Sequence, residues 1–187
     1  MSTAEHLLYE FPCNEKIRTY LRLEALFQRF DWFCEQTSAI AHQAGISALF
    51  DLLDATARSD LRHELIQELE RQRQRLIAKN ASADPDMAAH LAEIGAAIQA
   101  VSDSVGRTTQ SVRENQWLQI IRTRQSIAGG TCEFDLPQMH LWMNTAPEIR
   151  RRELQSYVST LEPIRTAGIS CGSTQTILRF FAASVIT

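Results

Sequence analysis

A thiol and an imidazole lie close together in this sequence, in a combination that could do chemistry. Cys132 and His140 are eight residues apart, and a cysteine nucleophile needs a base such as histidine to activate it. Neither residue stands in a signature of such an enzyme, and no further ligands complete a metal site around them. We therefore favour structural roles and expect no catalytic centre, no metal and no cofactor. An enzyme using both residues is the alternative, which mutating them would test.

The sequence also lacks the motifs of phosphate-binding loops and of catalytic metal sites. The sequence contains no GxxxxGK, no GxGxxG and no HExxH, the patterns of phosphate loops, dinucleotide folds and zinc proteases. The pair Gly129–Gly130 predicts a tight turn, because glycine adopts positive φ without a steric penalty.

Arginines at helical spacing offer a different chemistry, the binding of anions. In a helix predicted over residues 15–35, separations of 4 and 11 residues are close to whole turns, so three arginines share one stripe: Arg18, Arg22 and Arg29. In a helix predicted over residues 110–125, Arg113, Gln116 and Arg124 lie near one another. If these surfaces face each other, converging guanidinium groups would bind carboxylates bidentately. The simpler interpretation is a solvated face, which we also expect for the run at residues 150–152.

The composition limits the class of partner. The chain has 187 residues, of which 44% are hydrophobic, and a formal net charge of −3, so it suits one globular domain that does not mainly neutralise phosphates. Residues 1–106 hold 10 Lys/Arg against 16 Asp/Glu, and residues 107–187 hold 9 against 6. An anionic partner is therefore expected at the second part. A nucleic-acid-binding helical module remains the main alternative, and a gel-shift assay across salt concentrations would test it.

Cysteine usage and hydropathy indicate a cytoplasmic protein. The four cysteines are widely scattered and include no CxxC pair, and a chain of this length does not need disulfides, so a reducing compartment is favoured. No segment reaches the ~20 apolar residues of a membrane helix, and the N-terminus has no basic region followed by an apolar run.

Apolar periodicity predicts a mainly α fold, a multi-helix bundle with a short N-terminal extended segment at residues 7–11. Helices are expected at about 15–35, 38–57, 60–79, from 85 to Gly106, 110–125, 138–144 and 147–162. The buried faces of the first three are expected to consist of Ile17, Tyr20, Leu23, Phe27 and Phe30, then Ile46, Leu49, Phe50, Leu53 and Ala57, and then Leu61, Leu65, Leu69 and Leu76. The fourth has a heptad pattern and should pack on the third as an antiparallel hairpin; its positions are Met87, Leu91, Ile94, Ile98, Val101 and Val105. In the fifth, Trp117, Ile120 and Ile121 should face inward. We expect three parts: an extended segment 1–13, a helical domain 14–167 and a divergent tail 168–187.

Three separated blocks of the sequence agree in order and spacing with those of a known family. They are FPCNEKIRTYLRLE at 11–24, LFDLLDATARSDLRHELIQELERQRQRL at 49–76 and IRTRQSIAGGTCEFDLPQMHLWM at 121–143. On these blocks the sequence resembles the ZapD family. The resemblance implies a bacterial cell-division adaptor, not an enzyme, with a helical domain and a smaller C-terminal β-rich domain. It implies symmetric homodimers that bind the C-terminal tail of FtsZ and bundle its filaments at the mid-cell division ring, without nucleic acid or membrane as partners.

The resemblance also implies basic partner-binding residues. The family's arginine of the first helix matches Arg22, and the histidine of its DLPxxH stretch matches His140. In the family an arginine follows a RED sequence, whereas this chain has Gln116 after Arg113-Glu114-Asn115. Losing that charge should weaken anion binding unless Arg113 or Arg124 substitutes for it. The partner-binding set is therefore Arg22, Arg113, Gln116, Arg124 and His140.

The similarity stops near Ala167. The family continues into its β-rich domain, which this sequence largely lacks, as a truncated or frameshifted product would. From this we expect the extended segment LLYEF at 7–11 to have lost its partner sheet, with an exposed edge. Reduced FtsZ affinity and some aggregation would follow.

Overall fold

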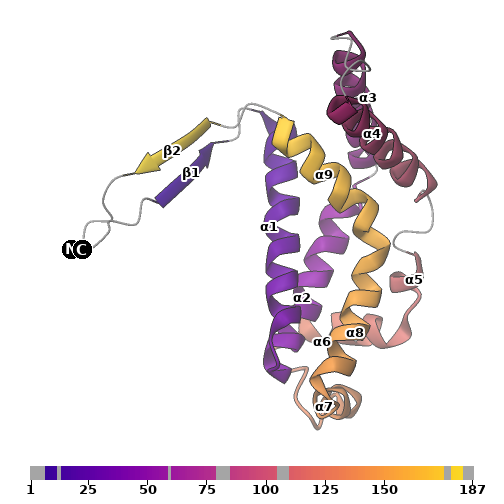
Figure 1. Cartoon of the computed structure of the whole chain (residues 1–187). Helices are drawn as coiled ribbons and strands as arrows, with labels where there is room; N and C mark the ends of the chain where they lie inside the picture. Colours follow the sequence, from indigo (N-terminus) through magenta and orange to yellow (C-terminus); the bar gives the residue numbers. More distant parts are fainter. Residues whose placement is uncertain are drawn as a thin grey trace.

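The computed structural model describes residues 7–11, 14–58, 60–78, 85–104, 110–174 and 178–182. Within these ranges the chain is mainly helical, as predicted (Figure 1). The elements are β1 (Leu7–Phe11), α1 (Glu15–Glu35), α2 (Ala39–Thr56), α3 (Leu61–Ala78), α4 (Pro85–Asp103), α5 (Gln110–Arg113), α6 (Gln116–Gln125), α7 (Pro137–Met143), α8 (Pro147–Val158), the 3₁₀ turn η2 (Ser159–Leu161), α9 (Glu162–Thr174) and β2 (Leu178–Ala182).

The long helix pair α1 and α2 forms the body of the molecule. The Asn14 side chain caps α1, because its Oδ1 accepts a hydrogen bond from the backbone N–H of Ile17 at 2.9 Å. The predicted apolar stripe of α1 is confirmed as buried: Ile17, Tyr20, Leu23, Phe27 and Phe30. Helices α8 and α9 pack on this pair, and Figure 1 shows α9 running beside α1.

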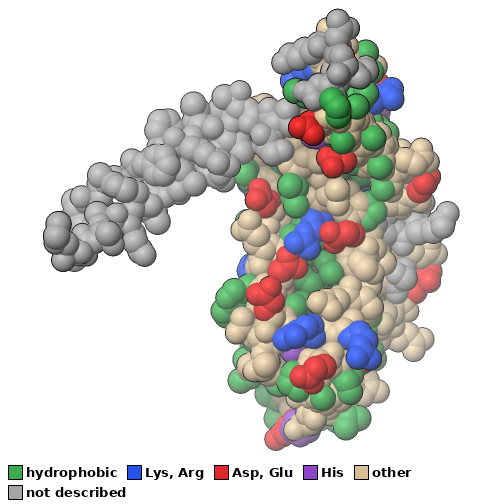
Figure 2. Space-filling model, viewed as in Figure 1, with side chains coloured by type: hydrophobic (Ala, Val, Ile, Leu, Met, Phe, Trp, Pro, Cys, Tyr) green, Lys and Arg blue, Asp and Glu red, His purple; other side chains and the backbone are tan. Residues whose placement is uncertain are grey.

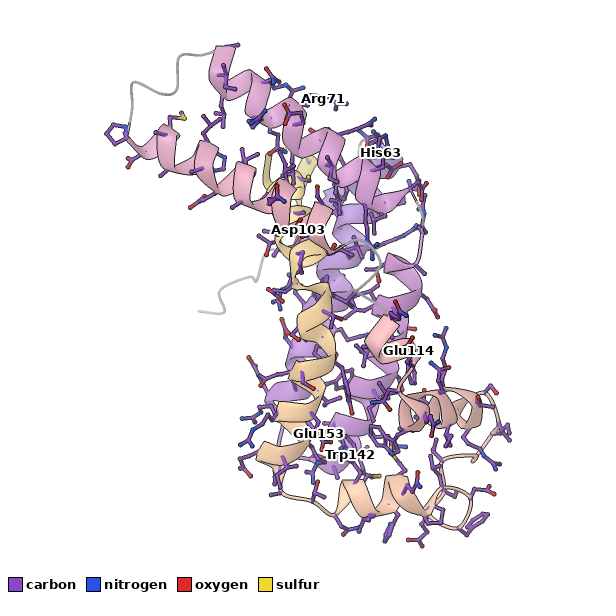
Figure 3. The ribbon with its side chains drawn as sticks, turned by 90° about the vertical axis from the view of Figure 1, so that its right-hand side faces the viewer. His63, Arg71, Asp103, Glu114, Trp142 and Glu153 are labelled. Carbon is purple, nitrogen blue, oxygen red and sulfur yellow. The ribbon has the colours of Figure 1, made fainter. Side chains whose placement is uncertain are left out.

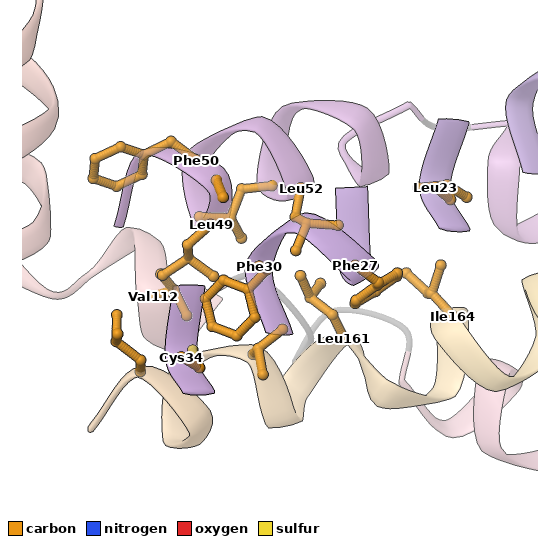
Figure 4. Packing of buried hydrophobic residues seen from close by; sticks show 14 of the residues in the cluster. Leu23, Phe27, Phe30, Cys34, Leu49, Phe50, Leu52, Val112, Leu161 and Ile164 are labelled. Carbon is orange, nitrogen blue, oxygen red and sulfur yellow. The ribbon is translucent and has the colours of Figure 1, made fainter. Parts of the chain in front are cut away.

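The core lies between α1, α2 and the segment from η2 into α9. Figure 4 shows Phe30 of α1 beside Leu49 and Leu161, and Phe27 beside Ile164. All of these side chains are buried, and burying one of this size stabilises a fold by about 1.5–3 kcal/mol. In α2 the predicted inward positions are confirmed except for Ala57, which is exposed and lies just past the helix.

Helices α3 and α4 pack on each other as the predicted hairpin, and α9 contacts both of them as well as α1. The hairpin stands at one end of the body (Figures 1 and 3). Ile94 and Val101 of the heptad pattern are buried, whereas Met87 near the start of α4 is exposed. Val105 and Gly106 lie outside the described residues.

The single helix predicted over residues 110–125 is two helices. Helix α5 ends at Arg113, and Asn115 begins α6 by accepting a hydrogen bond from the backbone N–H of Leu118 at 3.2 Å. An Asn side chain competes with continued helix because it offers such a cap. Ile121 is buried as predicted, but Ile120 is 42% exposed, so its inward placement was wrong.

The expectation that LLYEF lacks a partner was also wrong. Strand β1 pairs antiparallel with β2, with Leu7 opposite Ala182 and Phe11 opposite Leu178. Helix α9 likewise continues past residue 167 to Thr174. The division into 1–13, 14–167 and 168–187 as domains stays a prediction. In the part of the chain that the structure describes, no helix is long and apolar enough to span a bilayer.

Candidate functional site

Helices α1 and α6 meet the outer face of α2 through charged side chains. Arg29 of α1 pairs with Asp51, and Arg122 of α6 pairs with Asp54. Gln125, at the end of α6, donates to the Ser47 hydroxyl at 3.0 Å. Because residues 47, 51 and 54 follow helical spacing, one stripe of α2 is bordered by arginines on both sides.

The arginine stripe predicted on α1 is solvated in its first half. Nη1 of Arg18 lies 3.3 Å and Nη1 of Arg22 lies 3.6 Å from the carboxylate of Glu15. The Arg22 side chain is 64% exposed, so it is accessible to a partner. Its charge is nevertheless partly neutralised, because it shares one carboxylate with Arg18.

On α6, Arg122 is the arginine that reaches α2, and it is not among the candidate residues that the sequence suggested. Gln116 is exposed at the first position of α6, and Arg124 is half-buried in its last turn. Positions 122 and 124 lie roughly 200° apart around a helix, so Arg124 is directed away from the ion pair of Arg122. Arg113 is the last residue of α5, and its side chain lies outside the described residues. The spacing of Asp51 and Asp54 places both carboxylates on one face of α2 but does not indicate which arginine meets that face.

His140 lies on the exposed face of α7. Its Nδ1 is 3.1 Å from a carboxylate oxygen of Glu133, and its Nε2 is 3.4 Å from the amide nitrogen of Asn144. Asn144 also donates to the His140 backbone oxygen at 2.8 Å. The imidazole is therefore held between two polar side chains while 54% of it is exposed. Within the described contacts none joins His140 to Cys132.

Exposed apolar side chains occur on the loop before α7 and on α7 itself. They are Ile127, Phe134 and Leu141, and Phe134 is 80% exposed. The predicted tight turn lies between Ile127 and Phe134: Gly129 has a φ of 73°, and a Cβ on Gly130 would lie 2.3 Å from the backbone oxygen of Arg124. Both glycines are therefore required by the backbone path.

The run Arg150–Arg152 is not the solvated face that we expected. Arg150 is 3% exposed and donates to backbone oxygens of Thr37, Met143 and Thr145. Arg151 donates to the backbone oxygens of Cys34 and Glu35. Only Arg152 is exposed as predicted. The guanidinium groups of Arg150, which is buried, and of Arg151, which is half-buried, are thus engaged by backbone oxygens.

The buried thiols are unsuited to nucleophilic chemistry. Burial raises the pKa of Cys34 and of Cys171 to about 12, so both remain protonated near neutral pH. Cys132 is the exposed cysteine among the three that the structure describes. Cys13 lies outside the described residues.

The predicted partner-binding residues come from opposite ends of the body. Arg22 is in the first half of α1, whereas α7 with His140 lies at the other end of the α1–α2 pair (Figure 1). Among the described contacts none joins Arg22, Gln116, Arg124 and His140 to one another. On the face seen in Figure 2, basic and acidic side chains are interspersed. A single cavity in which these residues converge stays a prediction.

Comparison with known proteins gives one consistent family. The family model of ZapD, described as a cell division protein, matches residues 21–178. The chain is 42% identical over 163 residues to the cell division protein ZapD of Nitrosomonas eutropha, covering 86% of this chain and 65% of that protein. The corresponding protein of Dechloromonas aromatica is 42% identical with the same coverage, and that of Cupriavidus metallidurans is 43% identical, covering 87% and 66%. The chain thus spans about 65% of the length of these relatives.

Proposed function

The chain belongs to the ZapD family of cell division proteins, and from this premise we propose that it acts in cell division as an adaptor for FtsZ. It binds the C-terminal tail of FtsZ and bundles FtsZ filaments at the division ring. The observation behind this proposal is the family match over residues 21–178, which includes most of α1 and all of α6 and α7. In this role the protein binds a partner and catalyses no reaction.

The tail is a flexible peptide with acidic and apolar residues. Arg22, Arg124 and His140 supply cationic or hydrogen-bonding groups, and Arg113 and Gln116 are further members of the proposed set. Exposed apolar surface is offered by Ile127 and Phe134 before α7 and by Leu141, which follows His140 in the sequence. An exposed ion pair contributes only about 0–1 kcal/mol, so useful affinity needs several such contacts together with apolar burial.

The internal carboxylates make tail binding an exchange of partners. Glu15 lies beside Arg22, and Glu133 lies beside His140, so a tail carboxylate must displace one of them to contact the cation. The net binding free energy gained from each such contact is therefore smaller than the contact with an unpaired cation would give. Among the described ion pairs none involves Arg124, so a tail carboxylate can contact it without displacing an internal one, unlike at Arg22 and His140.

Bundling requires two tail sites in one assembly. A homodimer provides them, and linking two sites raises the effective concentration of the second without any new contact. The protein acts in the cytoplasm and is recruited to the mid-cell ring by FtsZ itself. Sedimentation equilibrium of this chain measures the dimer directly.

Co-sedimentation with FtsZ filaments tests the proposal. The 187-residue chain should pellet with filaments of full-length FtsZ and stay in the supernatant with filaments that lack the C-terminal tail. Added salt should reduce the pelleted fraction, because the contacts are partly electrostatic. Equal pelleting with tailless filaments, or none with either, would overturn the proposal.

A further inference from the structure

Arg150 occupies an unusual place for an arginine. Its guanidinium is 3% exposed, and its donors are directed at four acceptors. Nε donates to Nδ1 of His42 at 3.0 Å, one Nη donates to the oxygens of Met143 (2.9 Å) and Thr145, and the other donates to the Thr37 oxygen at 3.0 Å. One side chain therefore joins α8 to the end of α7, to the α1–α2 turn and to α2.

The neighbouring arginine completes the same junction. Arg151 donates from Nε to the Cys34 oxygen at 2.7 Å and from Nη2 to the Glu35 oxygen at 3.0 Å. Carbonyls at the end of a helix lack intrahelical partners and lie at the negative end of the helix dipole. The last turns of α1 and α7 thus provide the negative environment that a carboxylate usually gives a buried guanidinium.

Helix α7 depends on α8 for its placement. It has only seven residues, and Leu136 at its N-terminus provides no side-chain cap, so it is too short to be stable alone. Trp142 fixes its inner face, donating from Nε1 to Glu153 of α8 at 2.6 Å, as Figure 3 shows. Arg150 holds its last turn.

We propose that Arg150 is a positioning residue for the partner-binding surface: it fixes α7, and with it His140, against the corner between α1 and α2. The proposal rests on the proposed function, since tail binding is what gives His140 a role. No local sequence pattern predicts this role of Arg150, because Thr37 and His42 are more than 100 residues away from it in the sequence.

His42 makes this junction sensitive to acid. Its Nδ1 accepts from Arg150, and its Nε2 lies 3.4 Å from the Cys34 oxygen, so the ring is neutral with its proton on Nε2. Two guanidinium groups of α8 face it, those of Arg150 and Arg151, and on α1 the Cys34 thiol is neutral. A proton on Nδ1 would remove the acceptor and place a cation beside both arginines.

Hydrogen exchange of the whole 187-residue chain tests the positioning role. In Arg150→Lys, whose ammonium cannot span four acceptors, protection of the Asn144 and Thr145 amides should fall at least tenfold while protection in α9 is unchanged. Affinity for an FtsZ C-terminal tail peptide should fall at least threefold. Arg152→Lys, the exposed neighbour, is the matched control and should change neither. A folded Arg150→Lys variant with unchanged protection at residues 144 and 145, or with looser α7 but unchanged affinity, would overturn the proposal.

The wild-type pH profile gives a readout that does not depend on the variant folding. Protection factors at residues 144 and 145 should fall more steeply than those of α9 as the pH is lowered through the pKa of folded His42, which lies below the usual 6.5. A parallel response of α7 and α9 would overturn the proposal. If the wild-type chain fails to bind the tail peptide at all, the proposed function fails, and the exchange measurements still decide whether Arg150 positions α7.

Discussion

Arg122 of α6 and Asp54 of α2 form an ion pair, and the same guanidinium lies over the Phe50 ring, 5.6 Å from its centroid. One side chain thus contacts both the acidic stripe of α2 and an aromatic residue of the core. Arg124, two positions along, makes no described ion pair. If the proposed function holds, Arg122 should therefore contribute to stability and Arg124 to partner binding.

Replacing these two arginines should affect two different properties, the stability of the fold and the affinity for the tail. Arg122→Ala removes an exposed ion pair and a cation–π contact, so the free energy of unfolding should fall by about 0.5–1.5 kcal/mol. Arg124→Ala should leave stability within about 0.5 kcal/mol but lower affinity for the FtsZ tail peptide. Urea unfolding and fluorescence anisotropy measure the two quantities. Equal stability losses would contradict the assignment.

Neutralising the internal competitor of His140 should strengthen tail binding. Glu133→Gln keeps the side chain's size but removes the carboxylate that lies 3.1 Å from Nδ1. Affinity for the acidic tail should rise roughly two- to fivefold at low salt, the scale of one exposed ion pair. Glu148→Gln, an exposed change at the start of α8, is the charge-matched control. A lower affinity in Glu133→Gln would show that Glu133 helps binding.

Adding a cation at the start of α6 should also raise affinity. Gln116→Arg adds a cation at an exposed position, and a gain of about 0.5–1 kcal/mol is expected, together with a steeper salt dependence. Gln119→Arg adds the same charge elsewhere on α6 and should have a smaller effect. Equal gains from both variants would indicate a general charge effect instead of a specific contact.

Stability should fall in mild acid because of His42. Burial lowers its pKa below the usual 6.5, and the nearby charges of Arg150 and Arg151 add to this. The unfolded chain therefore binds the proton first, so the contribution is complete above about pH 6.5 and is lost as the pH falls toward the folded pKa. The urea midpoint should decrease from pH 7.5 to pH 5.5. In His42→Gln the urea midpoint should be lower at pH 7.5 but should change less with pH. If the midpoint of the variant falls with pH as steeply as that of the wild type, the pH dependence does not come from His42.

The turn at Gly130 should not accept a side chain. In Gly130→Ala the new Cβ meets the Arg124 backbone oxygen, so the loop must shift, and a loss of about 1–3 kcal/mol is expected. Gly95→Ala is the matched control, because nothing lies within 4 Å of its Cβ. As a helix-interior change in α4 it should stabilise by about 0.5–1 kcal/mol. Thermal unfolding compares the two, and similar shifts in Tm would refute the contrast.

Local periodicity accounts for what the sequence predicted well. The buried stripe of α1 and the Leu61, Leu65 and Leu69 positions of α3 follow from helical spacing alone, because each pattern is complete within one element. The break at Asn115 was missed because a capping side chain overrode a continuous amphipathic pattern.

The candidate site was harder to predict because its contacts are long-range. Arg150 and Arg151 bind backbone oxygens, and a carbonyl group has no residue identity that a sequence pattern could show. The approach of Arg122 to Asp54 joins residues 68 positions apart. Charge spacing on one helix predicts which side chains share a face, but not which face meets another helix.

The contrast between Cys132 and the two buried thiols gives a direct way to observe docking. Once Cys13 is replaced by serine, an environment-sensitive dye coupled by maleimide should attach to Cys132 and leave Cys34 and Cys171 unmodified. The fluorophore would then stand next to Glu133, on the approach to His140, and its emission would report in real time when a ligand arrives there.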